Sequence, residues 1–358
     1  MAWTTPRTWV TGELVTAAIL NTYVRDNQNA VDAGRLSIAS QAAGDVFYAS
    51  GTTAMARLAK DAGKFLKSGA SAVSWAAVDT PLQIVEGRLT LTSGTPVTTA
   101  DVTGATNIYF APYAGNRIAL YDGSSAWNIR TFTQITIAVG TISAAKPYDL
   151  FAYDNSGTVT FDAPLAWTDD DTRATALTTQ DGVLVKSGAT TRRYIGTFYT
   201  TATTTTEDSY VKRFLWNHAN RVHRPMRRIE TTSSWVYTTA TLRQAGGSTA
   251  NQLDFVCGVN ETQVNATVSA TFANSSADIN CLVSLGLDST SAHATGVIYN
   301  AASSNAGTPG VPDAHLVTFP GAGRHYVVWL EYSTASGTTT WYSGSALRDS
   351  GMQGWIEG

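Results

Sequence analysis

Alternating apolar and polar positions dominate the second half of the chain and predict β-strands there. Val264, Ala266, Val268, Ala270 and Phe272 occupy every second position, and the same period recurs at 253–259, 279–285 and 326–332. Successive side chains of a strand point to opposite faces, so each run predicts one face turned toward a core. Residues 190–358 are therefore predicted to form a C-terminal antiparallel module of the sandwich or jelly-roll type.

Shorter strands separated by turn residues precede this module. β-branched and aromatic residues gather at 88–92, 107–110, 117–121, 128–132, 133–139, 148–153 and 159–161. Turn sequences separate them, namely Ala114-Gly115-Asn116, Asp122-Gly123 and Asn155-Ser156-Gly157. This pattern predicts a first β module over residues 81–189, so the fold class is mainly β.

One stretch near the N-terminus has helical spacing. Thr11 is a candidate N-cap, and apart from Gly12 no Gly or Pro interrupts the run from there until Gly34. Alternating spacings of four and three residues define a candidate oligomer seam, formed by Val10, Leu14, Ala17, Asn21, Val24, Gln28 and Val31. Because so short a seam needs a partner, we expect residues 1–33 to be an attachment and oligomerisation helix; a helix packed on its own domain is the alternative.

Residues 34–80 are rich in Ala, Ser and Gly and carry only isolated apolar side chains, such as Phe47, Phe65 and Trp75. This content is too low for an independent core, and it predicts a stalk or linker that lies against partners.

Composition narrows the classes of partner. Only 14% of the residues are charged, where about 25% is usual, and the net charge is −3. No global field exists to attract nucleic acid, so we expect no nucleic-acid partner. The sequence has neither a signal-peptide pattern nor an apolar run of ~18 residues, and we expect no membrane insertion. Cys257 and Cys281 lie in alternating runs, which predicts buried free thiols that act as small apolar side chains.

The motifs that carry common chemistry are missing from the sequence. We find no phosphate loop, dinucleotide turn, zinc pair or nucleophile elbow, and therefore predict no catalytic residue, cofactor or metal, and no enzyme. Glycoside cleavage needs only two carboxylates, which distant parts of a β fold can supply. A polysaccharide depolymerase therefore remains the lower-ranked alternative.

One segment, residues 210–228, concentrates basic and aromatic side chains. Such a cluster can bind an anionic ligand, for example an acidic glycan or a lipopolysaccharide phosphate. The interpretation we favour is ion pairs within or between subunits, with arginine stems packed over aromatic rings. The candidate anionic-ligand or intersubunit patch consists of Lys212, Arg213, Trp216, Arg221, Arg224, Arg227 and Arg228.

Several stretches resemble structural proteins of tailed bacteriophages. Two stretches are similar to the N-terminal segments of these proteins, TWVTGE at 8–13 and LNTYVRDN at 20–27. Two others are similar to units of tail-fibre stalks, GDVFYASG at 44–51 and ARLAK at 56–60. Further similarities to fibre and virion β modules are NRIALYDG at 116–123, KPYDLF at 146–151, DGVLVKSG at 181–188, TRRYIGT at 191–197 and RFLWN at 213–217. The resemblance implies a non-enzymatic homotrimeric fibre of the virion, with an N-terminal attachment segment and distal β modules. It supplies no functional residues, and the single short stalk unit favours a short fibre, a tip protein or a head-attached fibre.

From these observations we expect a tail fibre or receptor-binding fibre. Its N-terminus would bind other tail or virion proteins, and its distal β modules would contact a host cell-surface glycan or another receptor. A connector, head-fibre or decoration protein that binds only neighbouring virion proteins is the alternative.

Overall fold

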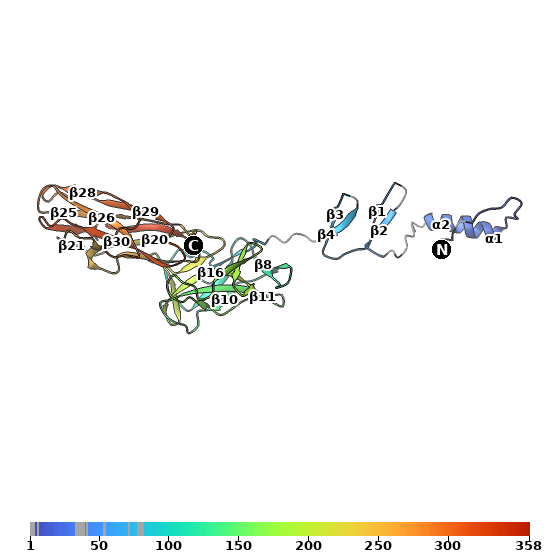
Figure 1. Cartoon of the computed structure of the whole chain (residues 1–358), viewed down its shortest axis with the longest axis horizontal. Coiled ribbons are helices and arrows are strands. Elements are labelled where there is room, and N and C mark those ends of the chain that lie inside the picture. The colour runs from blue at the N-terminus through green and yellow to red at the C-terminus, as the bar shows by residue number, and fades with distance from the viewer. Residues whose placement is uncertain are drawn as a thin grey trace. The chain divides into compact units, whose positions relative to one another are not determined.

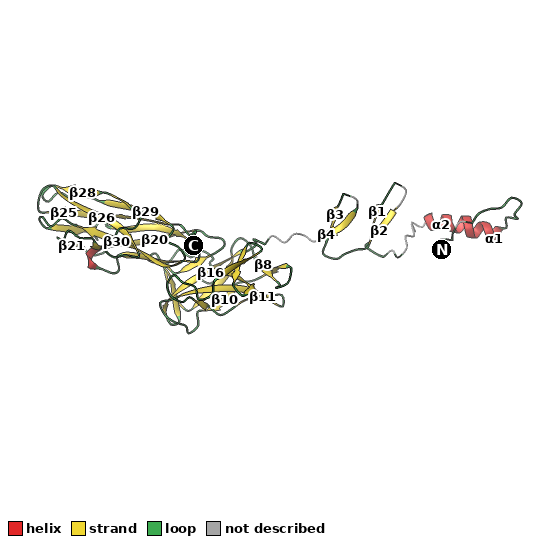
Figure 2. Ribbon diagram, viewed as in Figure 1, coloured by secondary structure: helices red, strands yellow, loops and turns green. Residues whose placement is uncertain are grey.

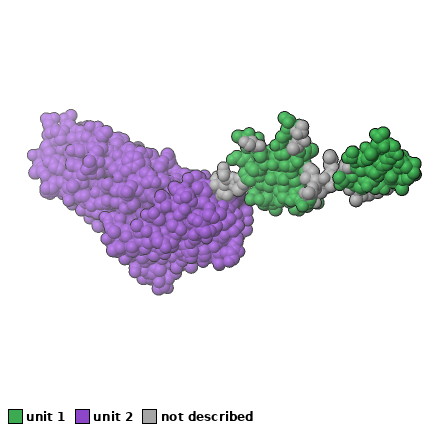
Figure 3. Space-filling model, turned by 45° about the vertical axis from the view of Figure 1, so that its right-hand side comes forward, with its two compact units in different colours: residues 1–79 green, residues 80–358 purple. Residues whose placement is uncertain are grey.

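The computed structural model describes residues 4–5, 7–32, 40, 42–52, 55–70, 72–76 and 82–358. The chain divides into two compact units, residues 1–79 and residues 80–358 (Figure 3). It is mainly β, as predicted, with helix near the N-terminus and a single 3-10 turn, η2 (Ala245–Gly247), in the second unit (Figure 2).

The helical segment of the first unit consists of α1 (Ala17–Leu20), a π-helical turn η1 (Asn21–Arg25) and α2 (Asp26–Asp32). The predicted start after Thr11 is wrong. Gly12 adopts a left-handed conformation (φ 84°), which interrupts any helix at that point, and Thr16 is the N-cap that accepts from the Ile19 amide at 3.3 Å. No helix among the described residues is long and apolar enough to cross a membrane.

The segment before the helix folds back onto it. The Asn27 side chain accepts from the Thr4 amide at 2.7 Å and donates to the Thr4 carbonyl at 2.8 Å. Arg7 forms an ion pair with Glu13 and lies over the Tyr23 ring, 5.5 Å from its centroid. These contacts fix the local path of the chain although they bury almost no apolar surface.

Two small hairpins follow within the first unit. The first pairs β1 (Val46–Ala49) with β2 (Met55–Leu58), and the second pairs β3 (Phe65–Ser68) with β4 (Val73–Ala76). Among the described residues up to 76 no apolar side chain is buried, and Asn27 is the one buried residue. A two-stranded hairpin is only marginally stable alone in water, so this unit contains little that would stabilise it in isolation.

The second unit begins with the predicted short strands, each found within two residues of its expected bounds. β5 (Gly87–Thr90), β7 (Asn107–Pro112) and β10 (Ile135–Ala138) form one sheet, and β8 (Arg117–Tyr121) pairs with β9 (Trp127–Thr131). Their core includes Phe110 stacked on Phe132 at 4.7 Å and Tyr148 stacked on Phe198 at 5.5 Å.

A long, almost wholly antiparallel sheet connects the two halves of this unit. Its main path runs through β12 (Thr158–Phe161), β11 (Pro147–Asn155), β16 (Ala189–Ala202), β17 (Thr205–Asp208), β18 (Lys212–Arg213), β23 (Gln252–Cys257), β30 (Gly323–Tyr332), β26 (Ile279–Leu287) and β28 (Ala301–Ser304). β6 (Val102–Ala105), β13 (Leu165–Ala166), β14 (Leu177–Gln180), β15 (Val183–Lys186), β19 (Leu215–Asn217) and β22 (Arg243–Gln244) pair at its sides. The boundary expected after residue 189 falls at the start of β16, which pairs with β11 and β15, so both β modules share this strand.

A second layer completes the C-terminal sandwich (Figure 1). Its sheets are β20 (His223–Ile229), β32 (Gly351–Glu357), β24 (Val264–Ser269), β29 (Asp313–Thr318) and β27 (Ile298–Tyr299), and the triple β21 (Ser234–Val236), β31 (Thr339–Tyr342) and β25 (Thr271–Asn274). The core between the layers contains Leu253, Phe255, Val264, Val268, Leu316, Trp329 and Trp341.

The alternating runs point inward as predicted. The residues at 264, 266, 268, 270 and 272 are all buried, as are those at 253, 255, 257 and 259. Cys257 and Cys281 are buried free thiols, which confirms the prediction, and burial raises the pKa of both. The run at 326–332 differs because β30 lies inside its sheet and both faces are covered, so Trp329 and Glu331 are fully buried as well.

Candidate functional site

The structure separates the basic-aromatic segment into a buried part and a part that faces outward. The segment supplies β18, β19 and β20, and along β20 buried and exposed residues alternate. Arg224 and Met226 therefore point into the molecule, whereas His223, Pro225 and Arg227 point outward. A patch contiguous in sequence is not one surface in space.

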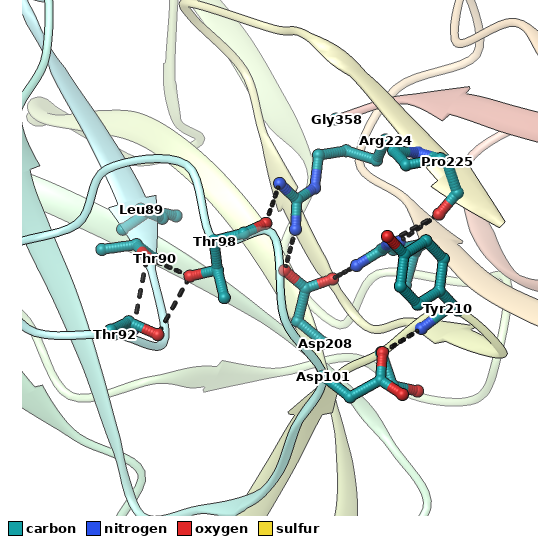
Figure 4. Close-up of polar contacts among 12 residues, drawn as sticks. Leu89, Thr90, Thr92, Thr98, Asp101, Asp208, Tyr210, Arg224, Pro225 and Gly358 are labelled. Carbon is teal, nitrogen blue, oxygen red and sulfur yellow. Dashed lines mark hydrogen bonds and ion pairs between the residues drawn. The ribbon is translucent and has the colours of Figure 1, made fainter.

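Asp208 is the centre of the buried part. Its two carboxylate oxygens accept from Arg213 at 2.8 Å and from Arg224 at 2.6 Å, and the side chains of all three residues are no more than 6% exposed. Arg224 also donates to the Thr98 carbonyl at 2.8 Å (Figure 4). Arg213 donates to the Pro225 carbonyl at 3.0 Å. These two arginines hold strands together and leave no charge available to a ligand.

Arg88 lies next to this network, and its two terminal nitrogens donate to carbonyls rather than to an acid. It donates to the carbonyls of Asn220 and Gly358. Burial, and after it repulsion from Arg224, lowers the pKa of Arg88 to about 10. Burial also lowers the pKa of Arg224, against the opposing attraction of Asp208. Both guanidiniums nevertheless stay charged at neutral pH.

The other members of the patch are also accounted for, except one. Lys212 pairs with Glu207 at 3.2 Å, Arg221 with Glu261 at 3.4 Å and Arg228 with Glu230 at 4.0 Å. Trp216 is fully buried, and Arg221 lies over its ring at 4.8 Å from the centroid. Of the six basic side chains of the patch, Arg227 alone has no carboxylate within ion-pair distance among the described residues.

Arg227 lines a hollow on the outer face of the sheet β20-β32-β24-β29-β27, which we call the outer hollow. Its volume is about 360 Å³, within the range of ligand pockets. An adjoining hollow of about 240 Å³ shares Arg227, Thr267 and Gln353 with it and adds Asp349. The outer hollow is lined by Tyr210, Pro225, Met226, Arg227, Asn265, Thr267, Gln353, Gly354 and Trp355.

The aromatic side chains that line the outer hollow are Tyr210 and Trp355. His223 stacks on Trp355 with the centroids 4.1 Å apart, which fixes the indole. Arg227 lies over Tyr210 at 5.0 Å, and its backbone amide donates to the Tyr210 carbonyl at 2.8 Å. The side-chain amides of Asn265 and Gln353 make no hydrogen bond within the described chain, so they are available to a ligand.

The sequence pattern included Arg227 in the candidate patch but none of the residues that line the outer hollow with it. Asn265, Gln353 and Trp355 come from two strands far along the chain, and the register Pro225↔Trp355↔Asn265 brings them together. A usable signal was present in the last strand, where the outward positions Gln353 and Trp355 alternate with the buried Met352 and Ile356.

The described members of the seam are all exposed. Val10 and Leu14 lie before the first helical residue, so they do not continue the helical face, and the π-helical turn at Asn21–Arg25 further breaks the heptad spacing. Asn21, Val24 and Gln28 line a shallow hollow of about 310 Å³ on the helix surface. Ala17 is exposed at the helix start, and the side chain of Val31 lies outside the described residues.

No group of three or more His, Cys, Asp or Glu side chains in the described part of the chain is placed to hold a metal ion.

No family model matches the chain, and no curated protein sequence matches it. Among solved structures, a tryptic core variant of Bacillus thuringiensis Cry1Da is 9% identical with a TM-score of 0.17, over 71% of this chain and 48% of that one. A Bacillus subtilis arabinoxylan arabinofuranohydrolase of glycoside hydrolase family 43 is 10% identical with a TM-score of 0.18, over 80% and 57%. Infectious bursal disease virus, Gx strain, gives 11% identity and a TM-score of 0.15, over 72% and 78%. The chain thus spans about half the length of the first two, and TM-scores this low carry no argument about fold or function.

Proposed function

We propose that the chain is an attachment fibre of a tailed-bacteriophage virion. In this proposal residues 1–79 join copies of the chain, as a homotrimer, to one another and to other virion proteins. Residues 80–358 then present a β surface to a receptor on the host cell. The protein acts by binding and not by catalysis.

The contrast between the two units carries the proposal. The second unit has large buried cores, whereas none of the apolar side chains described in the first unit is buried. Leu14 is 81% exposed, Val10 70% and Val24 47%. Exposed apolar side chains gathered on one short segment are typical of an interaction surface. A segment with this character attached to a self-sufficient β domain suits a protein that is anchored at one end and binds at the other.

The assembly part is tested by the mass of the full chain in solution. We expect sedimentation equilibrium to give three times the chain mass, and Val24→Asp to shift the protein toward the monomer because a charge at a buried contact is costly. Thr22→Asp adds the same charge to an exposed helical position that does not line the helix hollow and serves as the control. A monomeric wild-type chain, or a trimer unaffected by Val24→Asp, would contradict this part.

The receptor part is tested by competition. The full chain, added in excess to host cells, should reduce adsorption of the phage that carries it. Particles that lack the protein should assemble and fail to adsorb. Normal adsorption in the presence of saturating protein would contradict receptor binding.

A connector or decoration protein is the second candidate. Exposed apolar side chains favour it, namely Ile298 in β27 at 70%, Val317 in β29 at 56% and Phe319 directly after β29 at 59% exposure. In that case particles that lack the protein would assemble poorly or lose integrity, and the added chain would leave adsorption unchanged.

A further inference from the structure

We propose that the outer hollow binds an anionic saccharide, meaning a pyranose ring that carries a carboxylate or a phosphate, and that Arg227 binds the anionic group. The inference rests on the proposed function, because it names the ligand class that the receptor-binding surface would take.

The first argument is the missing counter-ion of Arg227. The neighbouring cations of the same segment are each matched by an acid, and Asp208 even serves two of them. Arg227 is exposed, its guanidinium lies over the Tyr210 ring, and it lines a hollow of ligand size. A guanidinium presents a planar fork of donors that matches a carboxylate or a phosphate. An oriented guanidinium without a protein acid is suited to bind such a group from a ligand.

The second argument is the chemistry of the remaining walls. Trp355 offers apolar ring surface, on which the C–H face of a sugar ring can pack. Asn265 and Gln353 each offer both a donor and an acceptor, as paired hydroxyl groups of a sugar require. The Thr267 hydroxyl donates to the Gln353 carbonyl at 3.3 Å and can still accept. The set combines apolar stacking, neutral polar groups and one cation, which fits a sugar with a single charge.

The third argument is the continuity of the site. The adjoining hollow begins at the same Arg227, Thr267 and Gln353 and ends at Asp349 and Ser350. A second sugar ring has room there, where Asp349 can accept hydroxyl hydrogens. A strand of nucleic acid would need a row of cations along its path, and these hollows present one cation and one acid.

The test uses the full chain and four probes: glucuronic acid, glucose 6-phosphate, glucose and sodium acetate. In ligand-detected NMR titrations we expect at least one charged sugar to bind tenfold or more tightly than glucose, with acetate weaker than the charged sugar. The tighter of the two charged sugars identifies whether the receptor group is a carboxylate or a phosphate.

Three variants locate the binding. Arg227→Gln should lower the affinity for the charged sugar to that for glucose, and Trp355→Ala should weaken both sugars. Arg192→Gln removes the same charge from another arginine that lies over a tyrosine, 4.0 Å from the Tyr153 centroid, and should change nothing. Thermal unfolding of each variant checks that it folds.

Three results would overturn the inference: equal affinity for glucose and both charged sugars, acetate binding as tightly as the charged sugars, or binding unaffected by Arg227→Gln. Absence of binding by both charged sugars up to about 10 mM would overturn it as well. If Arg227→Gln blocks phage adsorption as well as the wild type does, this inference fails while the proposed function stands. If the wild type binds the charged sugar and does not block adsorption, the sugar site stands and the proposed receptor-binding function fails.

Discussion

Removal of the Asp208 charge, which is shared by two arginines of the patch, should destabilise the second unit strongly. Asp208→Asn leaves Arg213 and Arg224 buried without their shared counter-ion, each with a side chain only 5% exposed. Removing one partner of a buried ion pair costs about 3–5 kcal/mol, because the remaining charge stays uncompensated. We therefore expect a decrease of that size in the free energy of unfolding, measured by urea titration with tryptophan fluorescence.

The matched control is Asp162→Asn. Asp162 pairs with Arg192 at 3.2 Å, and both side chains are roughly one-third exposed, at 28% and 32%. Loss of so exposed a pair should cost about 0–1 kcal/mol. If the two variants lose the same stability, the view of Asp208 as a structural centre is refuted, and its arginines would have to be reconsidered as part of a binding surface.

Three further predictions concern pH and packing. Burial lowers the pKa of His218 from 6.5 to about 4, so between these pH values the unfolded chain binds more protons than the folded chain. The free energy of unfolding should therefore fall by up to about 3 kcal/mol from pH 6.5 to pH 4. His218→Gln should remove this contribution to the pH dependence of stability. Gly258→Ala places a methyl group against the buried Trp216 ring and should cost about 1–3 kcal/mol in the same urea assay. Three backbone N–H groups at 124–126 lower the pKa of Asp122 to about 2, so an NMR titration should find its midpoint there, and the stabilisation it gives at neutral pH should disappear as the pH falls below its unfolded pKa toward 2.

The strands of the second unit were the predictable part of the fold, whereas the two hairpins within residues 46–76 lie in a stretch for which the sequence indicated only a stalk or linker. Alternation of apolar and polar residues identifies a strand without knowledge of the strands that pair with it. The inward positions at 264–272 could therefore be assigned from sequence alone. Turn residues also indicated the hairpin of β11 and β12, where Ser156 and Gly157 adopt the positive φ typical of such a turn. The helix start was not predictable from spacing, because Thr11 and Thr16 are both acceptable N-caps and the choice depended on the conformation of Gly12.

The candidate site was only partly predictable for a different reason. Six cations within one segment look like a binding surface, yet their carboxylate partners include Glu261, which lies forty positions beyond Arg221. Likewise, Trp355 reaches Arg227 only through the pairing of β20 with β32. The sequence shows that the segment is rich in cations. Which of these cations lacks a carboxylate partner depends on how the strands pair.

The position of β32 has a consequence for how the protein is made. This strand, residues 351–357, lies between β20 and β24, which were synthesised long before it. Until it inserts, both neighbours present open edges that invite pairing with other chains. The sheet therefore closes late, after a long loop has been ordered, and slow folding with a risk of aggregation is the expected result. A chain that ends before residue 351 would lack the strand that joins β20 to the rest of this sheet.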